Sequence, residues 1–327
     1  MVADGLHSRV RERCAARGRR AGAQVARPAA LQAGGGSGIA RGQMSAATRP
    51  GTPANLVLNA SPSSGARQRL AVRDVRDGFG LWRLFMTLGW LDIRLRYRGS
   101  VLGPFWLTLS TGVMVAALGV LYSALFKMDL HDYLPFLALS LVLWGFLSGI
   151  VAEGCLCFTQ AEGTIRSVRM PFTVHAARVV VRNLLVLAHN VAVIVAVYAL
   201  FNAWPGAAAL LALPGLLLWV VDALAVCLLL GTVCARFRDI APIVGSVMQI
   251  AFFVSPVIWK PELLVGEQAY WLPFNPFFTL LEIVRAPLLG QVPEGHVWLS
   301  ALAYSALLCG ATWTGFSRVR SRLAFWV

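Results

Sequence analysis

Long uncharged segments, separated by short arginine-rich ones, dominate the pattern of this chain from residue 103 onward. The first runs from Gly103 to Phe126, 24 residues without a charge, directly after the arginines Arg94, Arg96 and Arg98. About 20 apolar residues in a helix cross the hydrocarbon core of a bilayer. The pattern therefore predicts a membrane-spanning helix whose arginine-rich end lies on the cytoplasmic side.

The same criterion predicts five further spans, at residues 133–152, about 178–201, about 207–234, 240–259 and 295–317. The third and fourth spans share one uncharged run, Asn183–Val221, which the turn signal Asn202–Gly206 divides into two antiparallel helices. Twelve arginines flank the predicted inner ends, against three basic residues at the outer ends. The positive-inside rule therefore places both termini in the cytoplasm.

The segments before the first span have a different composition. Residues 1–67 are rich in Arg, Ala, Gly, Ser and Pro and predict a disordered basic extension. Translation from Met44 is an equally plausible alternative, in which case residues 1–43 are an artefact of start-codon choice. In residues 68–100, aromatic and arginine residues alternate at helical spacing over Phe79–Tyr97, which predicts an amphipathic helix in the membrane interface or a helix packed on a partner.

Residues 101–327 form the predicted six-span domain. Between its fifth and sixth spans, residues 260–296 are apolar but repeatedly interrupted by proline, which predicts short re-entrant helices in the outer leaflet. The fold class expected from the sequence is thus an all-α integral membrane protein.

Composition and charge agree with a lipid environment. Hydrophobic residues make up 57% of the chain and charged residues 13%, well below the roughly one quarter typical of soluble domains. The net charge is +14, but the first 70 residues supply most of the excess arginine and the remainder flanks apolar runs. This placement indicates topology signals and contacts with anionic lipid, not a nucleic-acid surface.

The cysteines and the familiar catalytic motifs offer little chemistry. Cys155, Cys157, Cys227, Cys234 and Cys309 lie in or beside apolar runs, and we expect neither disulfides nor a metal site. The chain has two lysines and no G-x-x-x-x-G-K-[ST] sequence, so it does not hydrolyse ATP through a P-loop.

Two polar positions stand near mid-span on consecutive helices, His189 and Asp222. Because the helices are antiparallel, the two side chains could meet. An ionisable group in lipid is costly unless it is paired, which favours either a proton or substrate site or a structural clamp between helices.

Several short motifs, in order along the frame, resemble the membrane subunits of ATP-binding-cassette exporters for O-antigen, capsule and teichoic-acid polysaccharides. The resemblance covers residues 79–325. Its motifs are Arg96–Trp106, Met170-Pro171, His189-Asn190, Arg236–Ile240, and Asn275-Pro276-Phe277 followed by Glu282 and Arg285.

This resemblance implies a non-enzymatic transport subunit that moves a lipid-linked polysaccharide across the bacterial inner membrane. It implies a homodimer with two copies of a separate ATPase subunit, which would carry the ATP and magnesium, and no cofactor or metal on this chain. A related permease for a drug or a lipid is the alternative. An intramembrane transferase using His189 and Asp222 is a further one.

The resemblance also implies roles for individual residues. Residues 159–169 resemble the coupling helix that docks into the ATPase, with Glu162, Arg166 and Arg169 as docking residues or, alternatively, as contacts to lipid head groups. The helix at Phe79–Tyr97 would rest on the same ATPase. Glu282 and Arg285 would belong to an outer gate.

The first and fifth spans would line the channel. Sugar rings stack on aromatic faces, so the candidate lining residues are Trp106, Tyr122, Phe252, Phe253 and Trp259. Tyr122 and Trp259 fit an interfacial aromatic belt equally well. Phe252 and Phe253 cannot both face one pore, because adjacent helical residues point about 100° apart.

Overall fold

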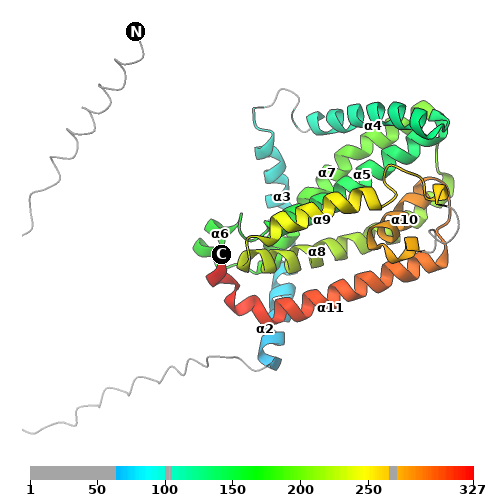
Figure 1. The fold of residues 1–327 in the computed structure, drawn as a ribbon. Coiled ribbons are helices and arrows are strands. Elements are labelled where there is room, and N and C mark those ends of the chain that lie inside the picture. The colour runs from blue at the N-terminus through cyan, green and yellow to red at the C-terminus, as the bar shows by residue number, and fades with distance from the viewer. Residues whose placement is uncertain (1–63, 100–102, 104, 265–270) are drawn as a thin grey trace, which may run out of the picture. The chain divides into compact units, whose positions relative to one another are not determined.

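A computed structural model describes residues 64–99, 103, 105–264 and 271–327, in which every regular element is a helix (Figure 1). The all-α class predicted from the sequence is confirmed. The predicted extension lies outside the described residues except for its last four, which begin the first helix. In chain order the elements are α2 (Ser64–Gly80), α3 (Trp82–Arg96), α4 (Phe105–Phe126), α5 (Leu130–Cys155), α6 (Glu162–Ser167), α7 (Phe172–Phe201), the 3₁₀ helix η1 (Gly206–Leu211), α8 (Ala212–Arg236), α9 (Ile240–Val254), the 3₁₀ turn η2 (Pro261–Leu263), α10 (Pro276–Leu288) and α11 (Gly295–Trp326).

Five helices of the described chain are long and apolar enough to cross a membrane: α4, α5, α7, the continuous η1–α8 segment and α11. The predicted fifth span, 240–259, corresponds to α9, which has only 15 residues and ends at Val254. Ser255 precedes Pro256 and is extended, with ψ at 146°. A residue before proline is driven out of the helical region, so the helix stops there and the predicted length was wrong.

Helix α5 forms the centre of the helical bundle. It packs against α7, α8 and α4, and its first half, from Tyr133 to Trp144, is continuously buried. Helix α4 lies at the periphery and buries only Thr108, Val115, Gly119 and Ser123. Gly119 lies so close to α5 that an added Cβ would come within 2.3 Å of Leu134 Cδ1, which explains why the two helices approach closely there.

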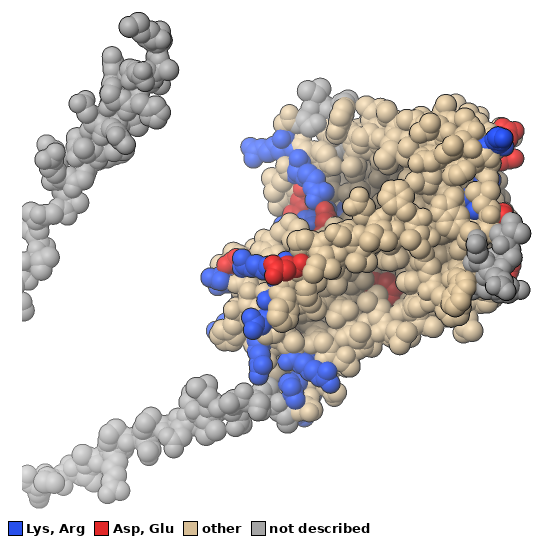
Figure 2. Space-filling model, in the orientation of Figure 1, with Lys and Arg blue, Asp and Glu red and all other residues tan. Residues whose placement is uncertain are grey.

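The longer helices lie side by side and α2 and α3 run across them, with α6 and the C-terminus at one end of the bundle and α10 at the other (Figure 1). Charged side chains gather at these two ends, and a broad, largely uncharged band separates them (Figure 2). We call the two ends the α6 end and the α10 end. The band has the character of a lipid-facing surface.

Three other predicted boundaries differ from the structure. The helix predicted over Phe79–Tyr97 corresponds to α3, which begins only at Trp82, because the chain turns at Leu81, directly after the weak helix former Gly80 that ends α2. The third span begins at Phe172 instead of residue 178, immediately after Pro171, where proline readily starts a helix. The last span continues to Trp326, so the arginines expected beyond it lie on α11 itself.

The segment after α9 follows its prediction in part. Helix α10 is short, and it starts where the Asn275 side chain accepts hydrogen bonds from the amides of Phe277 and Phe278. Pro276 occupies the first helical position. The preceding turn, η2, is only three residues long.

Candidate functional site

The polar helix α6 stands exposed between the ends of α5 and α7, where the sequence predicts a docking element. It covers Glu162–Ser167, shorter than the predicted 159–169, because the chain leaves α5 through several turns. Glu162 and Arg166 form an exposed ion pair at 2.9 Å. Arg166 also donates to the backbone oxygen of Val327 at 2.6 Å, which fastens α6 to the end of α11.

Arg169 follows α6 and is exposed. Its side chain makes no hydrogen bond or ion pair with any residue that the structure describes. Of the three predicted docking residues, it is therefore the one whose charge is fully available to a partner.

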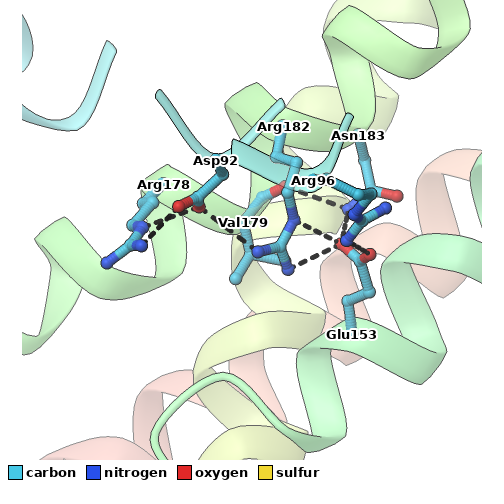
Figure 3. Close-up of polar contacts among 7 residues, drawn as sticks. All are labelled: Asp92, Arg96, Glu153, Arg178, Val179, Arg182 and Asn183. Carbon is cyan, nitrogen blue, oxygen red and sulfur yellow. Dashed lines mark hydrogen bonds and ion pairs between the residues drawn. The ribbon is translucent and has the colours of Figure 1, made fainter. Parts of the chain in front are cut away.

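Beside α6, a network of charged side chains joins three helix ends (Figure 3). Asp92 of α3 accepts from two arginines of α7. Arg178 binds both of its carboxylate oxygens, with Nε at 2.7 Å, and Arg182 donates from Nη1 at 3.2 Å. Paired, charge-assisted hydrogen bonds of this kind are among the stronger polar contacts in proteins.

Glu153, near the end of α5, completes the network (Figure 3). Its Oε2 accepts from Arg182 at 2.9 Å and from Asn183 at 2.6 Å, and its Oε1 accepts from Arg96 of α3 at 2.9 Å. The hydrogen bond with Glu153 raises the pKa of Arg96 above its usual value. The network therefore locks α3, α5 and α7 together at the α6 end.

A second buried carboxylate anchors α2. Asp74 accepts from the backbone amides of Phe172 and Thr173 at 3.2 and 3.0 Å, and from the Thr173 hydroxyl at 2.8 Å. Arg320 of α11 donates to it at 2.8 Å. A carboxylate at the start of α7 is also favoured by the helix dipole, so Asp74 ties α2 to both α7 and α11.

Sequence reasoning noted these charges as topology signals and missed the network. The sequence did contain a signal for the network, because acidic residues accompany the arginines at the predicted inner ends. Asp92 and Glu153 stand at predicted inner ends where arginine alone would satisfy the positive-inside rule.

The candidate channel residues of α4 differ in exposure. Trp106 is 56% exposed near the start of the helix. Tyr122 is half-buried and stacks on Phe126, with ring centroids 5.6 Å apart. Their role in lining a channel stays a prediction.

The candidates on and after α9 point in different directions. Phe252 packs against Trp144 of α5, with ring centroids 5.7 Å apart, whereas Phe253 is 62% exposed. The two neighbours therefore do not share one face, as helix geometry predicted. Trp259 donates its indole N–H to the backbone oxygen of Phe253 at 3.1 Å, which folds the chain back over the end of α9.

Among the described residues, no hydrogen bond or ion pair joins His189 to Asp222, and each side chain contacts a different partner. His189 Nδ1 lies 2.6 Å from the backbone oxygen of Leu185 on its own helix. Asp222 instead accepts from Ser305 of α11 at 2.6 Å. Asp222 is buried, and its hydrogen bond with Ser305 joins α8 to α11. A proton or substrate role for this carboxylate stays a prediction.

Glu282 and Arg285 form an ion pair within α10. Arg285 is fully buried: it donates to Ser140 at 2.9 Å and to the backbone oxygen of Pro256, and it lies 4.6 Å from the ring centre of Phe136. This arginine joins α10 to α5 and to the turn after α9. Its part in an outer gate stays a prediction.

The five cysteines in the described residues are unpaired, and all but Cys309 are buried. Burial raises the pKa of the Cys157 thiol to about 12, so this cysteine is unreactive at neutral pH.

Comparison with known proteins agrees with this architecture. Residues 83–289 match the ABC-2 type transporter family. An O-antigen export system permease protein RfbA from Myxococcus xanthus is 24% identical over 256 residues, which cover 77% of this chain and 98% of that protein. An RfbA from Klebsiella pneumoniae is 18% identical over 202 residues, 62% of this chain and 78% of that protein. The matched family region takes in the charged network, α6, the central helices and α10, and on this evidence the chain belongs to the ABC-2 type transporter family.

Proposed function

We propose that this chain is the membrane-spanning subunit of an ATP-driven exporter that moves a lipid-linked polysaccharide of the O-antigen type across the bacterial inner membrane. The family match over residues 83–289 carries the proposal, because it covers the helical bundle from α3 to α10. The named function of the Myxococcus and Klebsiella relatives supports the substrate class.

The energy source lies on a partner in this proposal. The sequence has no P-loop, so ATP and magnesium would bind a separate ATPase subunit, in two copies. The α6 end would face the cytoplasm, together with both termini. Helix α6 is exposed at this end, beside the helix ends that the charged network joins. Its position would let it transmit a conformational change of the ATPase to the helical bundle.

A homodimer would enclose the channel. Helix α9 buries only Met248 and leaves Ile243, Val247, Ile250 and Val254 exposed along one side. These positions recur at helical spacing and form an apolar stripe. In the proposal, α9 and the poorly buried α4 of each copy line the path of the glycan, with Trp106 and Phe253 among the exposed aromatic residues.

The test is reconstitution with the candidate ATPase and a charge reversal at the docking site. We expect a stable two-plus-two complex whose ATP turnover responds to lipid-linked polysaccharide. Arg169→Glu should weaken co-purification and lower the glycan-stimulated turnover, because the exposed charge at the α6 end changes sign. Lys127→Glu reverses an exposed charge in the turn between α4 and α5, at the other end of the bundle, and should leave both unchanged.

The outcomes separate the candidate functions. If the chain binds no ATPase and leaves glycan unmoved, the exporter proposal fails. If turnover responds to a lipid or a drug but not to the glycan, the chain is a permease for that other substrate.

A further inference from the structure

The α10 end contains an open cavity of about 440 Å³, within the range of small-molecule sites. Four separate segments line it: the start of α5, the turn between α7 and η1, the turn around η2, and α10 with the residues after it. The site therefore depends on the folded bundle and not on one loop.

The polar groups of the cavity are nearly balanced in charge. Three carboxylates and two cationic side chains face it, and Glu282 and Arg285 neutralise each other as an ion pair. Beyond that pair, the cavity contains the carboxylate of Glu262, the ammonium group of Lys260 and the carboxylate of Asp132, whose Oδ1 lies 4.0 Å from Nδ1 of His131. These remaining groups have one more negative charge than positive charges, so the cavity disfavours a phosphate-like anion.

Several of these groups are free to bind a ligand. Within the described residues, the side chains of Glu262 and Gln291 make no hydrogen bond or ion pair, and Lys260 makes only a contact with the ring of Phe136, at 5.8 Å. No cluster of three or more His, Cys, Asp or Glu side chains in that part of the chain is placed to hold a metal ion. The cavity thus offers separate hydrogen-bond donors and acceptors without a metal site.

One wall of the cavity is an aromatic ring held in place. Trp204 is 58% exposed, and its ring stands edge-on to Tyr198, with centroids 6.0 Å apart. Tyr198 in turn donates its hydroxyl to the backbone oxygen of Leu288 on α10. The indole is therefore packed along one edge before any ligand arrives, which limits the entropy lost on binding.

We propose that this cavity binds an uncharged sugar unit of the exported glycan. A pyranose has hydroxyl groups that both donate and accept hydrogen bonds around its rim, and an apolar C–H face that packs on an aromatic ring. The carboxylates, the ammonium group and the Gln291 amide match the rim, and Trp204 matches the face. The inference rests on the proposed function, and it adds a site on the exit side, at the end that the charge pattern places outside the cytoplasm.

The experiment uses the full chain assembled with its ATPase in lipid nanodiscs. The probe is oligosaccharide from the host's own polymer, released from its lipid by mild acid and freed of phosphate, with inorganic phosphate as the charged comparator. Calorimetric titration measures the dissociation constant. We expect saturable binding of the oligosaccharide, on the order of 1 mM per site, and none of phosphate.

Two variants and two matched controls locate the site. Trp204→Ala and Glu262→Gln should each weaken binding about tenfold or more, because each removes one contact to the sugar. Trp271→Ala and Glu294→Gln alter an exposed tryptophan and an exposed carboxylate that do not line the cavity, and they should bind as the unaltered protein does. Glu262 is exposed, so its variant should fold normally even if Trp204→Ala does not.

Each outcome decides the inference. No saturable oligosaccharide binding, equal affinity in all four variants, or competition by phosphate overturns it, and polymer export by the unaltered protein would then leave the proposed function standing. Binding that the cavity variants alone weaken supports it. If the same unaltered protein moves no polymer, the proposed function fails while the sugar site remains.

Discussion

The charged network at the α6 end makes a sharp prediction for Glu153→Gln. The carboxylate accepts from Arg96 through one oxygen and from Arg182 and Asn183 through the other, at 2.6 to 2.9 Å. A glutamine keeps one acceptor oxygen and turns an NH2 group toward the remaining donors, so at least one arginine loses its partner.

The size of the effect follows from burial. Breaking a fully buried ion pair costs about 3–5 kcal/mol. The Glu153 side chain is 22% exposed, so water recovers part of that energy. We expect the free energy of unfolding to fall by about 2–3 kcal/mol, which corresponds to a melting temperature roughly 4–6 °C lower for a chain of this size.

The assay is thermal unfolding of the purified protein in nanodiscs, followed by tryptophan fluorescence. Glu162→Gln is the matched control, since it removes a carboxylate from an exposed i,i+4 pair with Arg166. Such pairs contribute about 0.3–0.5 kcal/mol, so its melting temperature should change by less than about 2 °C. Equal melting temperatures for the two variants would refute the structural role given to Glu153.

Three further predictions test other parts of the bundle. Asp74→Ala leaves the start of α7 without its acceptor and should cost about 3 kcal/mol, with faster amide exchange in α2; unchanged exchange would contradict its anchoring role. Asp222→Asn keeps an acceptor for its serine partner on α11, so export and stability should stay within about 1 kcal/mol, whereas lost export in stably inserted protein would show a proton or substrate role. Gly89→Ala places a Cβ 2.7 Å from Val181 Cγ1 and should destabilise the protein by about 1–3 kcal/mol, as measured by denaturant unfolding, whereas Gly80→Ala meets nothing within 4 Å and should not.

The apolar helices were predictable because lipid leaves a chain few choices. A spanning segment must form its backbone hydrogen bonds within itself and remain apolar for about 20 residues. Both requirements can be recognised from a short stretch of sequence. The predicted fifth span was too long because counting apolar residues ignored the restriction that Pro256 imposes on the backbone of Ser255. The boundary was therefore present in the sequence, in a local rule different from hydropathy.

The charged network was not predictable in the same way. Asp92, Glu153 and Arg182 are far apart in the chain, and their contacts depend on which helix ends lie together. The contacts of Asp222 were likewise not predictable, although its depth in the bundle was. Its position along α8 indicated a mid-span level, but each residue turns the helix by about 100°, and its side chain faces α11 instead of α7.

Helix α5 connects the two ends to which these residues belong. Near its C-terminal end, Glu153 binds arginines from α3 and α7, beside the exposed helix α6. Toward its other end, Ser140 and Phe136 hold the buried Arg285, next to the cavity at the α10 end. A 26-residue helix is about 39 Å long, and this one is packed along its first half against neighbouring helices. Because close-packed helices behave as rigid units, α5 is a direct structural link between the charged network beside α6 and the buried Arg285 at the α10 end.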